Sequence, residues 1–239
     1  MAEEMSPLFR IVLVRPRNPV NIGAVARAMA NFGLSDLAAA APHPPVWKEA
    51  LTENRAAVGA GHLLDRAAVR GSIPSAAEGC SLVLGTSALN RRSPDREVIP
   101  LPLAAGYIRK NSGGGRTAIV FGPEKHGLTE EDLSHCRAII AVPTAGAQPS
   151  MNLGHAVAVV CYELAGRAGP AGTGRVARPA RAAASPGELD STAAELIGFI
   201  ERTGGGKSPA QIRRAVQDLA GEKEALSLLR LLVRRASTP

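Results

Sequence analysis

Short runs of apolar residues alternate along this chain with longer stretches in which apolar residues recur every three or four positions. The short runs predict buried β-strands, and the periodic stretches predict helices with one apolar face. The strand candidates are 11–14, 37–40, 82–84, 118–121 and 139–142, with one further candidate near Leu63 and Leu64. Helical patterns fall between them, for instance at 50–58 and 101–110. Strands that alternate with helices predict an α/β fold built on an open, mostly parallel sheet.

Three of these strands lead through a short polar loop into a helix. The first strand is followed by a turn at 16–19 and by a helical pattern over 20–32. The fourth is followed by the tight loop 122–128, after which Thr129 with Asp132 three residues later forms an N-cap signature. Each unit alone is ordinary in an α/β protein, so their functional meaning depends on where the three loops meet.

The last predicted strand ends in a loop of proline, glycine and small polar residues. A helix follows at once, and its apolar residues share one face: Leu153, Ala156, Val157, Val160 and Leu164. Ser150 and Asn152 therefore stand at a helix N-terminus, where unpaired backbone N–H groups can hold an anion or a polar ligand. In open parallel sheets, ligands bind beyond the carboxyl ends of the strands. All three loops leave strands at that end, so we expect them to converge on one crevice.

Composition divides the chain into three parts. Residues 1–166 carry all the strand patterns and are expected to form the sheet domain. Residues 167–187 contain four arginines and no acidic residue, with few large apolar residues, which predicts a flexible basic linker. Residues 188–239 show three helical patterns, and Ser208 followed by Pro209 is typical of a helix start. This last part predicts a small helical C-terminal extension.

The overall composition narrows the class of protein. The chain has 239 residues, of which 45% are hydrophobic, enough for one sizeable domain and a small appendage. Its first residues lack the apolar segment of a signal peptide, and no apolar run is long enough to span a bilayer. Three widely separated cysteines argue against a disulfide framework and against a structural zinc site. We therefore expect a cytoplasmic protein that uses neither a membrane nor a metal.

Positive charge is concentrated near the C-terminus. Residues 1–166 hold 16 Lys and Arg against 14 Asp and Glu, whereas residues 167–239 hold 12 against 7. Clustered cations bind polyanions because binding releases counterions from the phosphates. The arginines of the predicted C-terminal helices are therefore expected to form a basic surface that binds a polyanionic partner: Arg213, Arg214, Arg230, Arg234 and Arg235. The alternative is an appendage that merely covers part of a dimer.

The three loop-and-helix units together resemble the motifs of a known enzyme class. The matching segments are 21–27 with Phe32 and Gly33, 121–124 with Gly127 and Leu128, and 142–143 with 150–153. In order and spacing they look like the SpoU-TrmH class of SPOUT RNA ribose 2′-O-methyltransferases, and the resemblance covers about residues 9–166. The ending Tyr162-Glu163-Leu164 and the helical extension look most like the TrmJ-type tRNA (cytidine/uridine-2′-O)-methyltransferases.

The resemblance implies a fold, a cofactor and an assembly. SPOUT domains carry a deep trefoil knot near the C-terminus of the sheet domain, here roughly over 117–166, although knots are otherwise rare. The class uses S-adenosylmethionine, whose binding site would include Thr86, Ser87, Gly122, Glu124, Gly127, Val142, Ser150 and Met151. The class is also homodimeric, and the resemblance implies that Arg27 of one subunit faces the cofactor of the other.

Five residues are candidates for catalysis: Arg27, Asn21, Glu124, Ser150 and Asn152. By resemblance Arg27 is the key catalytic residue. A guanidinium is a poor base, so we expect Arg27 to bind the substrate phosphate and to lower the pKa of the 2′-hydroxyl. Asn21 is expected to orient Arg27 or the ribose, and Glu124 to hold Asn21 or Arg27. Helix capping, backbone hydrogen bonding and an ordinary surface arginine are the structural alternatives.

The chain lacks the sequence motifs of several other enzyme classes. It also departs from the family pattern at two places, and the first of these bears on the RNA substrate. The chain has no dinucleotide-binding G-x-G-x-x-G, no P-loop and no nucleophile elbow. In TrmJ-type sequences an arginine-containing stretch usually follows Gly-Thr-Ser-Ala, whereas here Leu89 and Asn90 separate that segment (85–88) from Arg91 and Arg92. Met151 stands where the family usually has a leucine. The substrate expected is tRNA, at the anticodon loop. A ribosomal RNA methyltransferase and a catalytically silent RNA-binding module of the same fold are the alternatives.

Overall fold

A parallel β-sheet forms the centre of the molecule. The computed structural model describes residues 8–52, 55–88, 95–145, 150–168, 184–203, 207–219 and 223–236. In this part, seven parallel strands have the order β3-β2-β1-β6-β4-β7-β5. They are β1 (Phe9–Val14), β2 (Asp36–Ala40), β3 (Ala68–Arg70), β4 (Leu82–Ser87), β5 (Val98–Pro100), β6 (Thr117–Phe121) and β7 (Ala138–Ala141). The predicted α/β class is confirmed, and the strands β1, β6, β4 and β7 lie side by side.

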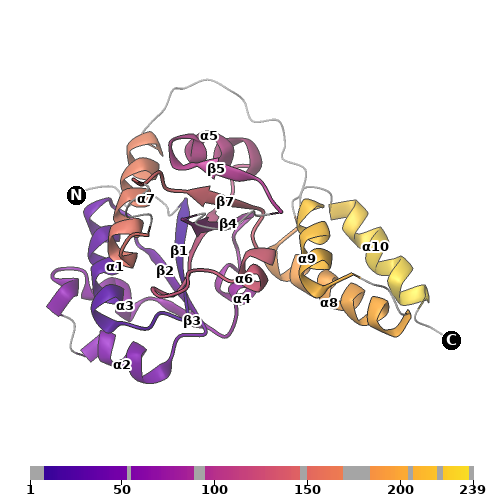
Figure 1. Ribbon diagram of the computed structural model, residues 1–239, viewed down its shortest axis with the longest axis horizontal. Helices are drawn as coiled ribbons and strands as arrows, with labels where there is room; N and C mark the ends of the chain where they lie inside the picture. The colour runs from indigo at the N-terminus through magenta and orange to yellow at the C-terminus, as the bar shows by residue number, and fades with distance from the viewer. Residues whose placement is uncertain are drawn as a thin grey trace.

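Helices cover both faces of this sheet (Figure 1). One face carries α1 (Pro19–Asn31), α2 (Pro44–Thr52), α3 (Gly61–Asp65), α5 (Leu101–Asn111) and α7 (Leu153–Ala168). The other carries α4 (Ile73–Ala76) and α6 (Glu130–Ser134). In β1, Ile11 and Leu13 face the first core while Val12 and Val14 face the second. Because both faces are buried, the strand is a continuous apolar run rather than an alternating one.

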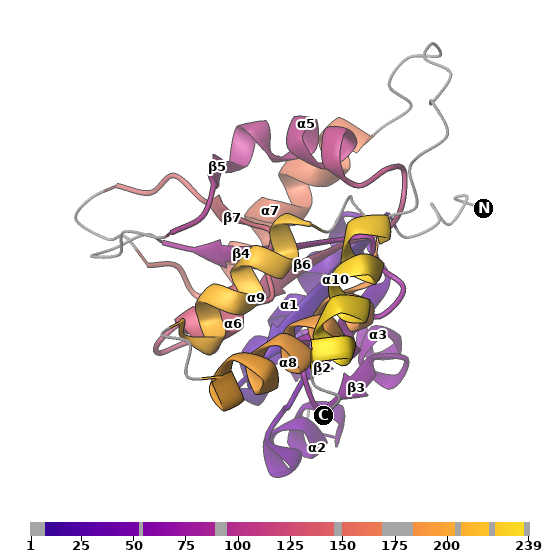
Figure 2. The ribbon, with the colours of Figure 1, turned by 90° about the vertical axis from the view of Figure 1, so that its right-hand side faces the viewer.

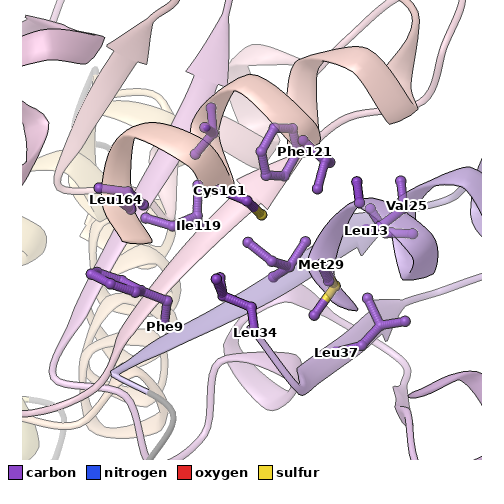
Figure 3. Packing of buried hydrophobic residues seen from close by; sticks show 14 of the residues in the cluster. Phe9, Leu13, Val25, Met29, Leu34, Leu37, Ile119, Phe121, Cys161 and Leu164 are labelled. Carbon is purple, nitrogen blue, oxygen red and sulfur yellow. The ribbon is translucent and has the colours of Figure 1, made fainter. Parts of the chain in front are cut away.

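The larger core lies between the sheet and the helices α1 and α7 (Figure 3). Met29 of α1, Ile119 of β6 and Leu164 of α7 are fully buried in it. The predicted apolar face of the last motif helix is confirmed, because Leu153, Val157, Val160 and Leu164 are all buried. The two helices also approach closely, since a Cβ added to Gly154 would lie 2.8 Å from the Cβ of Ala24. The helices that follow the first and last motif loops are therefore packed into one unit.

The structure differs from the sequence pattern in three places. Leu63 and Leu64 lie in α3 and not in a strand, because two adjacent apolar residues fit a buried helical turn equally well. The strands β3 and β5 have only three residues each and lie at the edges of the sheet, too short to give a pattern. The helix expected over 50–58 ends at Thr52, and a 3-10 turn follows at Arg55–Ala57.

The C-terminal extension consists of α8 (Pro186–Thr203), α9 (Pro209–Asp218) and α10 (Lys223–Ala236), as its three helical patterns predict. They surround a small core of their own, formed by Ala184, Leu189, Ala193, Val216 and Leu226. Ser208 caps α9 by accepting a hydrogen bond from Gln211 N, and Pro209 occupies the first turn. α8 lies beside α4 and α9 beside α6, while α10 packs on α8, on the side of the molecule away from α1 and α7 (Figures 1 and 2).

Hydrogen bonds fasten α9 to the segment that leads from α6 into β7. Gln217 Nε2 donates to His135 O (3.0 Å), and Arg214 Nη1 donates to Arg137 O (3.1 Å). In return, Arg137 Nη1 donates to Gln217 O (2.8 Å). His135 Nδ1 lies 3.4 Å from Asp190 of α8, and burial lowers the pKa of this histidine despite the neighbouring carboxylate. The extension is therefore docked on the sheet domain.

The arginines of the extension are engaged in ion pairs. The pairs are Arg213 with Glu131, Arg214 with Asp218, and both Arg230 and Arg234 with Glu195. Hydrogen bonds from Arg234 and Arg230 lower the pKa of Glu195 to about 2. Each of these four arginines therefore has a carboxylate partner on α6, α8 or α9, although Arg230 and Arg234 share a single one. That they form a basic surface for RNA stays a prediction. The side chain of Arg235 lies outside the described residues.

The proposed division into three parts stays a prediction. The helix α7 continues to Ala168 and α8 begins at Pro186, so described helices extend into both ends of the predicted linker 167–187. Residues 169–183 lie outside the described part of the chain. The trefoil knot also stays a prediction from the resemblance.

The close approach of α1 and α7 predicts that Gly154→Ala destabilises the fold. The new methyl group would overlap Ala24, and overpacking of this kind costs about 1–3 kcal/mol. Gly106→Ala is the matched control, because its Cβ would meet only Arg109 Nη2, at 3.9 Å, on the exposed side of α5. Thermal and urea unfolding should show a loss for Gly154→Ala and a gain of up to about 1 kcal/mol for Gly106→Ala. Equal gains for both variants would contradict the close packing.

Candidate active site

A cavity of about 320 Å³ lies at the carboxyl ends of β4, β6 and β7. The end of β4 and Ala88 form one wall, and the loop from Phe121 to Leu128 forms another. The segment after β7 and the start of α7 complete it, with Val142, Thr144, Ser150, Met151, Leu153 and Ala156. The volume falls at the lower end of the range of about 300–1,000 Å³ that is usual for small-molecule sites.

All eight residues expected to bind the cofactor line this one cavity: Thr86, Ser87, Gly122, Glu124, Gly127, Val142, Ser150 and Met151. Thr86 and Ser87 belong to the end of β4 and not to a loop, and Thr86 Oγ1 donates to Val120 O of the neighbouring strand (3.0 Å). The structure thus brings together residues that lie up to 65 positions apart in the sequence. Their roles in binding remain predictions.

Glycine is required where the loop after β6 turns back on itself. A Cβ on Gly122 would lie 2.2 Å from both Gly127 C and Leu128 N, a distance that no real side chain can occupy. Gly127 has a φ of +65°, in the left-handed region that favours glycine, and its N–H donates to Pro123 O (2.8 Å). The tight turn leaves the loop's backbone lining the cavity, where a ligand can approach it closely.

The Glu124 carboxylate joins this loop to the beginning of α1. Its Oε2 accepts from Arg17 N (3.1 Å), and its Oε1 accepts from Asn18 N (3.1 Å) and from Asn21 Nδ2 (3.1 Å). Hydrogen bonds to an ionised acceptor are stronger than bonds between neutral groups. Glu124 thus satisfies two backbone N–H groups before α1 and fixes the amide of Asn21.

Asn21 and Asn152 continue the connection to the last motif. Asn152 Nδ2 donates to Asn21 Oδ1 (2.9 Å), and Asn152 Oδ1 accepts from Gly154 N (2.9 Å) and more weakly from His155 N (3.4 Å). Asn152 therefore caps α7 while it holds Asn21. One continuous set of hydrogen bonds, from Glu124 through Asn21 to Asn152, links all three motif loops.

Arg27 lies apart from this network. Its side chain is exposed on α1, and it is not among the residues that line the cavity. Asn21 and Arg27 are six residues apart, which places them on different faces of the helix. Of the two predicted partners of Glu124, the structure shows Asn21, and within the described residues of one chain neither side chain has a hydrogen bond to Arg27. The roles of Asn21 and Arg27 stay predictions.

Arg27 belongs instead to an exposed surface formed by α1 and α7, which we call the α1–α7 face. Val20, seven residues before Arg27, shares its side of α1 and is 62% exposed. On α7, His155, Val159 and Tyr162 follow the helical period, and all are exposed. The Tyr162 ring meets that of Phe32 edge to face at 5.8 Å, next to the end of α1. An exposed surface of mixed apolar and cationic side chains is typical of a protein–protein contact.

Arg15 and Asp132 stabilise the loop before α1 from the other side of the sheet. Arg15 has a φ of +45°, which is uncommon for a residue with a side chain. Its guanidinium makes two hydrogen bonds to the carboxylate of Asp132, at 2.9 and 2.5 Å. Burial alone would raise the pKa of Asp132, but the bonds from Arg15 and Thr129 outweigh it and lower that pKa. Thr129 and Asp132 also form the capping box that the sequence predicts.

Sequence reasoning missed several residues of the site. Lys125 and His126 line the cavity, and the backbone N–H groups of Arg17 and Asn18 bind Glu124. Asn18 also caps α1, because its side chain accepts from Val20 N (2.9 Å). The pair Asn-Pro before an apolar helix is an N-cap signal, so this role could have been predicted. The contacts to Glu124 span more than 100 residues and leave no local signal.

No helix of the described residues combines the length and apolar character that crossing a membrane requires. Among the same residues, no group of three or more His, Cys, Asp and Glu side chains is placed to hold a metal ion.

The chain belongs to the SpoU rRNA Methylase family, whose model matches residues 8–162. The match includes all three motif loops and the cavity that they form. The resemblance found in the sequence is thus confirmed at the level of the family.

Individual relatives are TrmJ proteins. The chain is 40% identical over 156 residues to the tRNA (cytidine/uridine/adenosine-2′-O-)-methyltransferase TrmJ of Pseudomonas aeruginosa, which covers 65% of this chain and 60% of the relative. It is 32% identical over 194 residues to the TrmJ of Pectobacterium atrosepticum, covering 81% and 75% of the two chains. The crystal structure of TrmJ from Z. mobilis ZM4 superposes with a TM-score of 0.75 at 29% identity, over 96% of this chain and 99% of that one. The match thus spans about three fifths of the Pseudomonas protein.

The bonds at Glu124 predict that Glu124→Gln destabilises the fold. A glutamine offers one acceptor oxygen and places an NH₂ group toward an N–H donor, so at least one bond is lost. Loss of a bond to a charged group costs about 1.5–3 kcal/mol. Glu49→Gln on the exposed side of α2 is the matched control and should leave the free energy of unfolding nearly unchanged.

Amide hydrogen exchange provides the local readout for Glu124→Gln. The N–H groups of Arg17 and Asn18 should exchange faster in the variant than in the wild type, because their acceptor is altered. Unchanged stability and unchanged exchange at both amides would contradict the role of Glu124 as the link between the loops.

Proposed function

We propose that this protein is an S-adenosylmethionine-dependent RNA ribose 2′-O-methyltransferase that acts on tRNA. The observation that carries the proposal is the set of hydrogen bonds through Glu124, Asn21 and Asn152, which gathers the three motif loops of the family around one cavity. Two relatives are named tRNA 2′-O-methyltransferases. Within tRNA we propose the anticodon loop, because unpaired nucleotides expose their bases and 2′-hydroxyl groups to a protein.

The cavity fits S-adenosylmethionine in its chemistry. Its walls alternate apolar side chains with backbone and hydroxyl groups, as a ligand with an adenine, a ribose and a charged amino acid part requires. Gly122 and Gly127 keep the backbone accessible, and Val142 and Met151 supply apolar surface. Thr86, Ser87 and Ser150 supply hydroxyl groups. When bound, this cofactor supplies a methyl group made reactive by its sulfonium.

The protein's own contribution to methyl transfer is positioning. The Arg27 guanidinium binds the phosphate beside the target ribose with its planar fork and favours the ionised form of the 2′-hydroxyl. The hydrogen bonds from Glu124 through Asn21 to Asn152 keep the cavity walls fixed while the ribose is held in line with the methyl group. Holding two reactants in the productive geometry accounts for a large part of the rate in such reactions.

We infer a symmetric homodimer from the placement of Arg27. In one chain the guanidinium lies outside the cavity, on the α1–α7 face. Pairing of two such faces across a two-fold axis would cover Val20, Val159 and Tyr162. It would also bring Arg27 of one subunit to the site of the other. An RNA-modifying enzyme of this kind would act in the cytoplasm.

Methyl transfer to purified RNA tests the function. The wild-type protein should transfer labelled methyl groups from S-adenosylmethionine to unmodified tRNA, with 2′-O-methylated nucleosides in the digest by mass spectrometry. Arg27→Ala should reduce the rate by roughly two to three orders of magnitude and leave cofactor affinity intact. Arg27→Lys should also fail, because an ammonium cannot replace the bidentate fork.

The choice of RNA and the presence of transfer distinguish the proposed function from its alternatives. Transfer to ribosomal RNA and not to tRNA would contradict the proposed substrate, and cofactor binding without transfer to either RNA would favour a silent RNA-binding module. Mixed dimers of Arg27→Ala with the cavity-blocking variant Met151→Trp should recover part of the activity, since one site of each mixed dimer is intact. No recovery in a verified mixed dimer would contradict a site shared between subunits.

A further inference from the structure

Two exposed cations, Arg17 and Lys125, stand on two different loops that meet at Glu124, a residue that lines the cavity. Arg17 belongs to the loop before α1, and its backbone N–H donates to Glu124 Oε2 (3.1 Å). Lys125 follows Glu124 directly and lines the cavity. Both side chains are exposed, and neither has an ion pair within the described part of the chain. The Glu124 bonds therefore hold together the two loops that carry these cations.

The carboxylates of the Lys125 loop and of α6, the helix that follows it, are bonded elsewhere. Glu124 already accepts three hydrogen bonds from N–H donors. The acidic residues of α6 are each paired with another arginine: Glu130 with Arg96, Glu131 with Arg213 and Asp132 with Arg15. Hydrogen bonds from Arg15 and Thr129 overcome the effect of burial and lower the pKa of Asp132, which keeps this carboxylate ionised and engaged. Neutralisation of Arg17 and Lys125 is thus left to a ligand.

We propose that Arg17 and Lys125 form a clamp for the RNA backbone, binding phosphates on the strand that carries the target ribose. The inference rests on the proposed function and deepens it, because it assigns RNA binding to the rim of the cavity. Exposed, unpaired cations gain affinity for RNA by releasing counterions from the phosphates. Arg17 adds a planar donor fork, which fits phosphate oxygens, and Lys125 adds a mobile point charge.

Among the described residues, the two cations of the clamp differ from the arginines of the C-terminal extension in having no carboxylate partner. In the extension, Arg213, Arg214, Arg230 and Arg234 already have carboxylate partners, so a phosphate would have to displace them. At the cavity rim no such competition exists for the two cations of the clamp. RNA contacts there also place the strand directly over the cavity, where the methyl group is to be transferred.

The chain offers a matched control for charge. Arg66 follows α3 and Lys110 lies in the last turn of α5, and both helices lead into the amino ends of the strands that follow them. These two cations are exposed and also lack an ion pair within the described residues, but they lie at the edge of the sheet opposite the cavity. The double variants Arg17→Ala/Lys125→Ala and Arg66→Ala/Lys110→Ala therefore remove the same charge from opposite ends of the molecule.

The test measures the affinity of the full-length proteins for unmodified tRNA at several KCl concentrations, by filter binding. The clamp variant should bind more weakly than the wild type, and the slope of log affinity against log salt should fall by about two units. The control variant should keep a slope close to that of the wild type. Thermal unfolding checks the fold, and calorimetry with S-adenosylhomocysteine on Arg17→Ala, whose side chain lies outside the cavity, should give the wild-type affinity.

The outcomes distinguish the clamp from the function on which it rests. Equal affinities and slopes for the clamp variant and the wild type would overturn the clamp while leaving the methyltransferase function intact. An equal loss in both double variants would also overturn it, because net charge and not position would then decide binding. If the wild type methylates no RNA and binds none, the proposed function fails together with the clamp.

Discussion

The hydrogen bonds from Glu124 through Asn21 to Asn152 are the constraint on which the rest of the site depends. They join three loops that leave β1, β6 and β7 at the carboxyl ends of these strands, and the first loop lies more than 100 residues before the other two. Each member also serves its own element: Glu124 binds backbone N–H groups before α1, and Asn152 caps α7. Because each group bonds in two directions, a shift of one loop would break contacts in the other two. The cavity walls are thereby fixed before any ligand binds.

The two faces of the sheet have different tasks in this arrangement. The α1–α7 face is exposed, carries Arg27, and is held together by the close approach of Gly154 to Ala24. On the opposite face, the C-terminal helices dock on α6 through backbone carbonyls and ion pairs. Four arginines of the extension thus have carboxylate partners within the protein, whereas Arg17 and Lys125 have none among the described residues. Net charge by segment alone does not reveal this difference, because it ignores which carboxylates lie nearby.

The sequence predicted the elements that carry strong patterns and missed those that depend on distant contacts. The strands with four or more apolar residues and the apolar face of α7 follow directly from hydrophobic periodicity. β3 and β5 are edge strands of three residues, and Leu63-Leu64 gives the same signal in a helical turn as in a strand. The residues of the cavity came from the family resemblance, since no local rule connects Thr86 with Met151. The pairing of the C-terminal arginines could not be predicted from the sequence, because Glu131 lies on α6, 82 residues before its partner Arg213.

A double-mutant cycle on Asn21 and Asn152 tests the central claim most directly. The free energy of unfolding and the affinity for S-adenosylhomocysteine are measured for Asn21→Ala, Asn152→Ala and the double variant. If the two side chains link the first and last motif loops, the double variant should lose less than the sum of the single losses, by about 0.5–3 kcal/mol. Losses that add to within about 0.3–0.5 kcal/mol in both measurements would show that the two loops are held independently, which contradicts the account.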